Sequence, residues 1–263
     1  YSFWSSPVTG ATAESVFYPG SAQTNPDDWI RWDYTLTGSN GGDWDYFYNL
    51  GGPQTTLEPG IGYGFTPTQQ FPPTPNNITD TRTFSSSTIN NGNINVTLTG
   101  SDGDDYALLG NPYPSNLNIS DFLSDNDQIT DAVYIWSDNA FDFNVEGGYY
   151  TLNAAGITAS PLLQSATPSM LYIAPMQGFF VQLVQSPGDN IVHFTNNQRA
   201  TGNSTFLKTD PAEYAWLSLA HESGTGNQVV VGLKDQAVAG YAQGEDSPCL
   251  KMSATMEFCV TDP

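Results

Sequence analysis

The chain has 263 residues, of which 38% are hydrophobic, so it is long enough and apolar enough to bury a core in each of two ordinary domains. Its 27 acidic and 6 basic residues give a formal net charge of −21, which disfavours nucleic acid and anionic lipid as partners and leaves cations and neutral polymers such as glycans. The abundance of Gly, Pro, Ser, Thr and Asn, with 13% aromatic residues, favours an all-β fold. No apolar run reaches about 18 residues, so membrane insertion is not expected.

The sequence contains an internal repeat of roughly 105 residues. The opening YSFWSSPVTGATAESVF aligns with YALLGNPYPSNLNISDFL, and LEPGIGYGF aligns with IAPMQGFFV. The matched pairs are Tyr1 with Tyr106, Pro7 with Pro112, Trp32 with Trp136, Pro59 with Pro175, Gly62 with Gly178, Tyr63 with Phe179 and Phe84 with Phe194. Short alternating or apolar runs such as GNINVTLTG and QGFFVQLV, separated by turn residues, predict half-buried antiparallel strands in each unit.

Units of this size, built from short strands, predict tandem β-sandwich lobes of jelly-roll-like type with short helical turns. We assign residues 1–104 to the first repeat and residues 105–207 to the second. A third copy begins near Tyr214, so residues 208–263 are expected to start a third repeat or to supply strands that complete an assembly.

In the first unit, a group of aromatic residues lies in a polar segment that repeats poorly. The group consists of Trp29, Trp44, Tyr46 and Tyr48. Exposed rings in such a segment stack on sugars or pack against another subunit, and a partly exposed structural cluster is the alternative interpretation. The tryptophans that recur at equivalent repeat positions are expected in the core; these are Trp4, Trp32, Trp136 and Trp216.

Two loops concentrate carboxylates, the ligands that hard cations prefer. They contain Asp102, Asp104 and Asp105 in the first loop and Asp125 and Asp127 in the second. The second loop departs from the usual calcium-loop pattern, because Ile129 replaces the third ligand and no Gly follows. Each of these loops is therefore either a calcium-binding site or a solvated acidic turn.

A sharp corner follows the first strand of the second unit. Pro112 and Pro114 offer no N–H to a neighbouring strand, and Pro112 holds Asn111 out of the helical region, so the strand ladder must end there. Residues 115–120 supply capping groups for a helical turn over the end of the sandwich. Its apolar side of i, i+3, i+4 spacing is Ile119, Phe122 and Leu123. We therefore predict that the corner is structural, with its side chains hydrogen-bonded to backbone.

Catalytic and redox signals are sparse. The only histidines are His193, in an alternating strand, and His221, in a segment that reads as a hairpin turn. No nucleophile elbow, zinc-binding helix motif or phosphate loop is present in the sequence. Cys249 and Cys259 form either a disulfide or two free thiols.

The segments LLGNPYPSNLNISDFLSDN, VYIWSD, YIAPMQGFFVQ and FTNNQR, followed by WLSL and NQVVVGLKDQAVAGYAQGEDS, resemble the repeated β-rich modules of large secreted surface proteins of Bacteroidota. Such GNPYPS-containing modules are similar to those upstream of the C-terminal sorting domain of the type IX secretion system. The resemblance covers nearly the whole chain and implies an extracellular or outer-surface protein with an adhesive, structural or unassigned role.

Together these features lead us to expect a non-enzymatic structural or adhesive surface protein, a candidate subunit of a filament or sheath. Its expected partners are other copies of itself or cell-surface components. The alternative is a glycan-binding module of a secreted polysaccharide-degrading protein. Calcium is the only cofactor that the sequence suggests.

Overall fold

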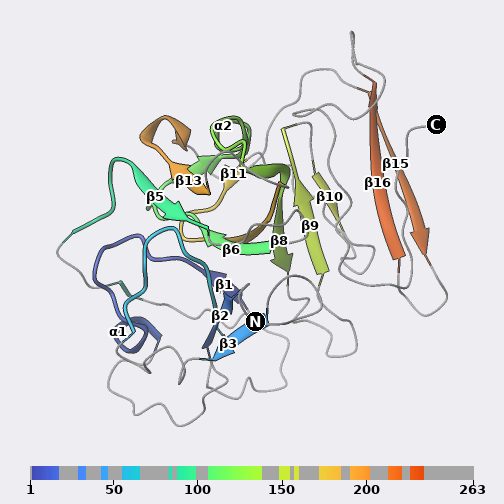
Figure 1. The fold of residues 1–263 in the computed structure, drawn as a ribbon. Helices are drawn as coiled ribbons and strands as arrows, with labels where there is room; N and C mark the ends of the chain where they lie inside the picture. Colours follow the sequence, from blue (N-terminus) through green and yellow to red (C-terminus); the bar gives the residue numbers. More distant parts are fainter. Residues whose placement is uncertain are drawn as a thin grey trace.

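The protein is described here from a computed structural model. The structure describes residues 2–17, 29–33, 43–46, 55–65, 83–84, 88–98, 106–137, 148–154, 157–159, 172–184, 190–201, 213–220 and 226–233. The fold is all-β, as predicted, with antiparallel sheets and short helices (Figure 1). Among the described residues, no helix is long and apolar enough to cross a membrane.

The first repeat unit forms a four-stranded antiparallel sheet, here called the first sheet. Its strand order is β1 (Ser2–Trp4), β4 (Tyr63–Phe65), β2 (Trp29–Asp33) and β3 (Asp43–Tyr46). The helix α1 (Ala13–Phe17) follows β1. The apolar residues on the helix side of this sheet form the core of the first unit, which contains Val8, Ala11, Ala13, Val16, Leu57, Tyr63 and Phe65.

The second repeat unit forms a five-stranded antiparallel sheet, here called the second sheet. Its order is β10 (Ile157–Ala159), β9 (Gly148–Leu152), β8 (Ile129–Ser137), β12 (Gly178–Leu183) and β6 (Tyr106–Gly110). Read from the other edge, β6-β12-β8-β9 repeats the order β1-β4-β2-β3 of the first sheet. The two units therefore share one strand topology.

The strand register also follows the alignment of the sequence with itself. In the first sheet Trp4 pairs with Tyr63, and in the second sheet Leu109 pairs with Phe179. The alignment places Trp4 on Leu109 and Tyr63 on Phe179. The repeat thus extends to individual residue pairs.

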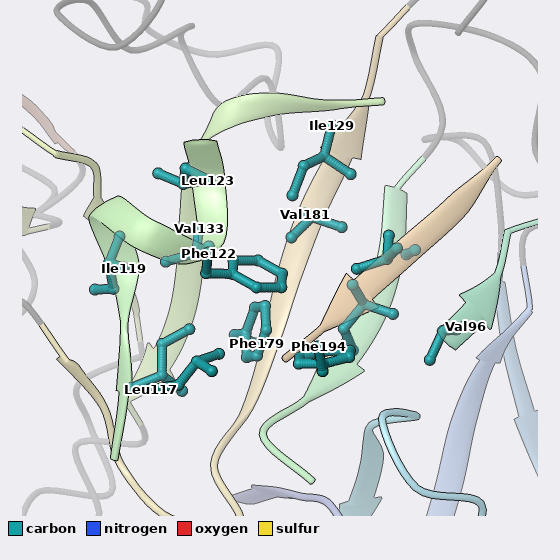
Figure 2. Close-up of a cluster of buried hydrophobic side chains, with 14 of the residues drawn as sticks. Val96, Leu117, Ile119, Phe122, Leu123, Ile129, Val133, Phe179, Val181 and Phe194 are labelled. Carbon is teal, nitrogen blue, oxygen red and sulfur yellow. The ribbon is translucent and has the colours of Figure 1, made fainter. Parts of the chain in front are cut away.

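One face of the second sheet is covered by α2 (Ile119–Ser124) and two small sheets. The small sheets are β11 (Tyr172–Ile173), β7 (Asn116–Asn118) and β14 (Arg199–Ala200), and β13 (Ile191–Phe194) with β5 (Ile94–Thr97). A 3-10 turn at Asn196–Gln198 joins β13 to β14. Figure 2 shows the resulting core, in which Phe122 and Phe179 meet edge to face and Phe122 stacks on Phe194.

The position of β5 differs from the predicted domain division. The boundary between residues 104 and 105 assigns β5 to the first unit, but β5 pairs with β13 of the second, and Val96 packs in the core of that unit. Strand pairing across such a distance along the chain leaves no trace in local periodicity, so the sequence could not show it. Residues 94–97 therefore belong structurally to the second unit.

Residues beyond 207 contain a long hairpin. The strands β15 (Glu213–Ala220) and β16 (Gly226–Leu233) pair antiparallel, and β16 lies beside β10 (Figure 1). In both earlier units the first strand pairs with a late strand of its unit, whereas β15 pairs with the next strand along the chain. The described strands of this segment therefore do not repeat the arrangement that begins each unit.

Candidate functional site

The two repeat units meet through aromatic side chains that lie between the first and second sheets. The ring of Phe180 on β12 is near the centre of this cluster, with centroid separations of 5.7 Å to Phe3, 5.4 Å to Trp32 and 6.0 Å to Trp44. These rings meet at interplanar angles of 77° to 86°. Edge-to-face pairs at such separations contribute about 0.5–1.5 kcal/mol each beyond simple area burial. We call this set the inter-unit aromatic cluster.

Trp44 belongs to this cluster and is not the flat exposed ring that a sugar-stacking platform requires. Its ring lies 5.2 Å from that of Trp32 at 84°, because β3 pairs with β2 and brings the two residues directly opposite each other. This packing favours a partly exposed structural cluster over a sugar-stacking platform for Trp44. The side chains of Trp29 and Tyr46, and the whole of Tyr48, lie outside the described residues.

Backbone hydrogen bonds also join the two units, and they occur in equivalent pairs. Ser5 donates its N–H to the carbonyl of Met176 at 2.9 Å, and Gly110 donates to the carbonyl of Gly60 at 3.0 Å. The sequence repeat places Ser5 on Gly110 and Gly60 on Met176. Isolated bridges match in the same way, with Trp4 opposite Gln177 and Leu109 opposite Ile61.

This reciprocity means that the units are related by an approximate two-fold axis. The segment that leads into β4 pairs with β6, and the segment that leads into β12 pairs with β1. Each of these two segments thus contributes to both sheets, which is how packed sheets form a shared corner. The interface is isologous in the sense used for homodimers, although both halves belong to one chain.

Two equivalent glycines allow this close approach. A Cβ atom on Gly178 would lie 2.6 Å from Cβ of Phe3 and 3.0 Å from the nitrogen of Trp4. A Cβ atom on Gly62 would lie 2.5 Å from the carbonyl oxygen of Leu109. Real Cβ atoms essentially never come this close, so both positions require glycine for a steric reason.

The corner after β6 is held by the side chain of Asn111, which is 0% exposed. Its Nδ2 donates to the carbonyls of Ser115 at 2.8 Å and Ala174 at 3.0 Å, and its Oδ1 accepts from the N–H of Tyr113 at 3.0 Å. All of these partners are backbone groups, so the asparagine serves the fold. Phe122, on the helix that follows, is also 0% exposed and fills the core below it.

The two prolines of the corner differ in environment. Pro112 is buried and its carbonyl accepts from Nδ2 of Asn90 at 3.0 Å, whereas Pro114 is exposed. The helix α2 begins at a cap that the sequence also suggests, because Oδ1 of Asn118 accepts from the N–H of Asp121. The corner therefore turns the chain from β6 into β7 and α2.

The predicted cation loops are only partly described. Asp125 and Asp127 are exposed, and a carboxylate oxygen of Asp125 accepts from Nε2 of Gln198 at 2.8 Å. Within the described ranges, no group of three or more His, Cys, Asp or Glu side chains could hold a metal ion. The other loop, with Asp102, Asp104 and Asp105, lies outside the described residues, as do Cys249 and Cys259.

His193 lies on β13 opposite Asn95 of β5, and its Nδ1 is 3.0 Å from Oδ1 of that asparagine. The other predicted histidine, His221, is outside the described residues. Burial raises the pKa of Tyr63 to about 12 and that of Tyr113 to about 12. Both hydroxyls remain protonated at neutral pH and serve as hydrogen-bonding groups, Tyr113 donating to the carbonyl of Gly92 at 2.6 Å.

A polar surface cleft of about 290 Å³ lies beside β5. Its lining comes from three separate stretches of the chain and consists of Thr9, Glu58, Pro59, Thr88, Ile89, Asn90, Asn91, Ile94 and Asn95. Sequence reasoning did not identify these residues as a site. Their stretches converge through long-range contacts, namely the bridge of Val8 to Ile89 and the hydrogen bonds of Thr9 with Thr88 and Asn90. The Asn-Asn-Gly turn at residues 90–92 was the available local signal.

Comparisons with known proteins give one match. A search of curated proteins and a search of solved structures each found nothing similar. The family described as "Domain of unknown function (DUF8693)" matches residues 1–261. Because this match covers almost the entire sequence, the chain belongs to that family.

Proposed function

We propose that the chain is a non-enzymatic structural module of an extracellular surface protein and that it associates with further copies of itself. The observation that carries this proposal is the reciprocal packing of the two repeat units. In this fold one unit packs against the equivalent face of the other, and this mode of packing is suited to assembling larger structures from repeated units.

Surface charge supports an extracellular structural role. With a net charge of −21, the body is repelled by nucleic acid and by anionic lipid at moderate salt, which suits a protein that stays in solution or at a cell surface. The resemblance to repeated β-rich surface modules of Bacteroidota, exported by the type IX secretion system, points in the same direction.

Sheet edges are the surfaces through which further copies would join. Within the described strands, β3 ends the first sheet and β10 ends the second, while β16 runs beside β10. An edge strand presents backbone N–H and carbonyl groups that a neighbouring chain can pair with. The edges of β1 and β6 are already bridged by the opposite unit.

Structural packing is favoured over a glycan-stacking role for the aromatic residues because Trp44 contributes to the inter-unit aromatic cluster. The Trp44→Ala variant separates the two roles. We expect it to lose thermal stability and to keep whatever glycan affinity the wild-type chain has. Loss of glycan binding with unchanged stability would refute the structural role of this residue.

Self-association is tested by sedimentation velocity and negative-stain electron microscopy of the full chain at increasing concentration, with and without calcium and salt. We expect concentration-dependent oligomers or filaments. Monodisperse monomers under every condition would refute assembly. Labelling of intact producing cells with an antibody against the chain tests the location, and labelling only after lysis would refute a surface position.

A further inference from the structure

The polar surface cleft beside β5 has a floor that is fixed by a dense set of hydrogen bonds. Asn90 is 4% exposed, and its Nδ2 donates to the carbonyls of Ser6 at 2.9 Å and Pro112 at 3.0 Å. Its Oδ1 accepts from the hydroxyl of Thr9 at 2.9 Å, and its N–H donates to the carbonyl of Pro7 at 2.9 Å. A floor that is held in this way needs little ordering when a ligand binds.

Two asparagines in the wall are oriented by basic side chains behind them. Oδ1 of Asn91 accepts from Nη1 of Arg199 at 2.9 Å, and Oδ1 of Asn95 lies 3.0 Å from Nδ1 of His193. Each amide oxygen is therefore engaged, and each Nδ2 has no hydrogen-bond partner within the described part of the chain. The wall thus presents two amide groups, each with two N–H donors, at a fixed orientation.

Arg199 itself is held firmly. Its Nε donates to the hydroxyl of Ser115 at 2.9 Å, its Nη1 also donates to Oδ1 of Asn196 at 3.1 Å, and its guanidinium lies 5.0 Å from the ring centroid of Tyr113. Through its hydrogen bond with Arg199, Asn91 is therefore positioned by the second unit, although Asn91 precedes that unit in the chain.

The cleft also offers an acceptor and an apolar surface. The exposed carboxylate of Glu58 lines it, and the backbone N–H of this residue donates to the hydroxyl of Tyr63 at 2.9 Å. Ile89 also lines the cleft and is 64% exposed, and its backbone is bridged to Val8. The Ile89 side chain is thus the apolar surface that the cleft exposes.

From this combination we propose that the cleft binds a neutral sugar ring, such as the terminal residue of a glycan. Each sugar hydroxyl both donates and accepts, which matches the amide donors of Asn91 and Asn95 and the acceptor of Glu58. The C–H face of the ring would pack on Ile89. The volume of about 290 Å³ suits one ring rather than a long chain.

Charge narrows the ligand class further. Glu58 and a net charge of −21 disfavour sugars that carry a carboxylate, sulfate or phosphate. The side chains of Arg199 and His193 hydrogen-bond to the asparagines and so orient the two amides. This proposal does not depend on self-association of the chain.

Saturation-transfer NMR of the full chain with a panel of neutral methyl hexosides tests the proposal, with methyl glucuronide as the charge control. We expect transfer to at least one neutral glycoside and weaker transfer to the glucuronide. Absence of transfer from every neutral glycoside at about 10 mM, ten times the Kd of about 1 mM that corresponds to weak binding, would overturn the proposal.

Titration calorimetry of variants then places the ligand. Asn95→Ala and Glu58→Ala each remove an exposed hydrogen-bonding group, and each should weaken binding by about tenfold. Ile89→Ala should weaken binding through lost apolar contact. Asn197→Ala is the matched control, because Asn197 is exposed and lies outside the cleft lining. This variant should bind the sugar with the affinity of the wild type. Wild-type affinity in all three cleft variants would overturn the assignment to this cleft.

Discussion

Replacing Gly178 by alanine should loosen the interface between the two repeat units. The added Cβ would lie 2.6 Å from Cβ of Phe3, 2.9 Å from the carbonyl carbon of Phe3 and 3.0 Å from the nitrogen of Trp4. Ordinary van der Waals contact begins near 3.4 Å, and two of the three obstructing atoms belong to backbone, so β1 must shift by roughly an ångström.

The expected cost follows from two opposing terms. Overpacking of this kind destabilises a fold by about 1–3 kcal/mol. The alanine also restricts the unfolded chain, which favours folding by about 0.4–1 kcal/mol. The steric term wins, and we expect a net loss of about 1–2 kcal/mol in the free energy of unfolding, measured by urea denaturation.

Two further glycines provide the comparison. Gly62→Ala should cost a similar amount, because the equivalent contact in the other unit is just as close. Gly10 has φ of +81° with no atom within 4 Å of an added Cβ, so Gly10→Ala introduces only backbone strain of about 1–2 kcal/mol. Near-UV circular dichroism separates the cases, because only the interface variants should alter the aromatic signal. Wild-type stability and spectra in both interface variants would refute the reciprocal packing.

The other predictions concern the corner, the core and alkaline pH. Asn111→Ala should lower the free energy of unfolding by about 1–3 kcal/mol because buried backbone groups lose their partner; full stability with lost binding or assembly would instead mark a functional site. Phe122→Ala should cost about 3–5 kcal/mol in the same urea assay, and a loss below about 1 kcal/mol would contradict its place in the core. Burial raises the pKa of Tyr63 and Tyr113 to about 12, against about 10 in the unfolded chain, so the folded state holds these protons more tightly. Their contribution to stability is complete below about pH 10 and is lost as the pH rises towards 12, which denaturation midpoints across this range will show; a midpoint that rises with pH would contradict the sign.

Local signals in the sequence predicted much of the architecture. The repeat alignment matched Trp4 with Leu109 and Tyr63 with Phe179, and in the structure these equivalent residues occupy equivalent ladder positions. The missing N–H of Pro112 placed the end of β6. Such features depend on neighbours along the chain or on the comparison of one unit with the other.

Features that depend on distant pairing could not be predicted. Trp44 lies between two sheets because it packs against Phe180 of β12, far along the chain, which periodicity does not encode. Asn95 meets His193 only through the pairing of β5 with β13. The polar surface cleft depends on the long-range contact of residues 8–9 with residues 88–90, so the Asn-Asn-Gly turn was its one local signal in the sequence.

The β5–β13 ladder makes the two repeat units differ at equivalent positions. Gly60 and Met176 are equivalent and both have positive φ, at +86° and +61°, but a Cβ on Gly60 would lie 2.6 Å from Val96 of β5, whereas Met176 carries a full side chain. The two equivalent positions therefore differ in chemistry, so the two halves of the chain are not interchangeable. A subunit with unlike ends that joins end to end adds copies in one direction and does not close into a two-fold pair. If copies of the chain join head to tail, the resulting fibre would therefore be polar, with two different ends.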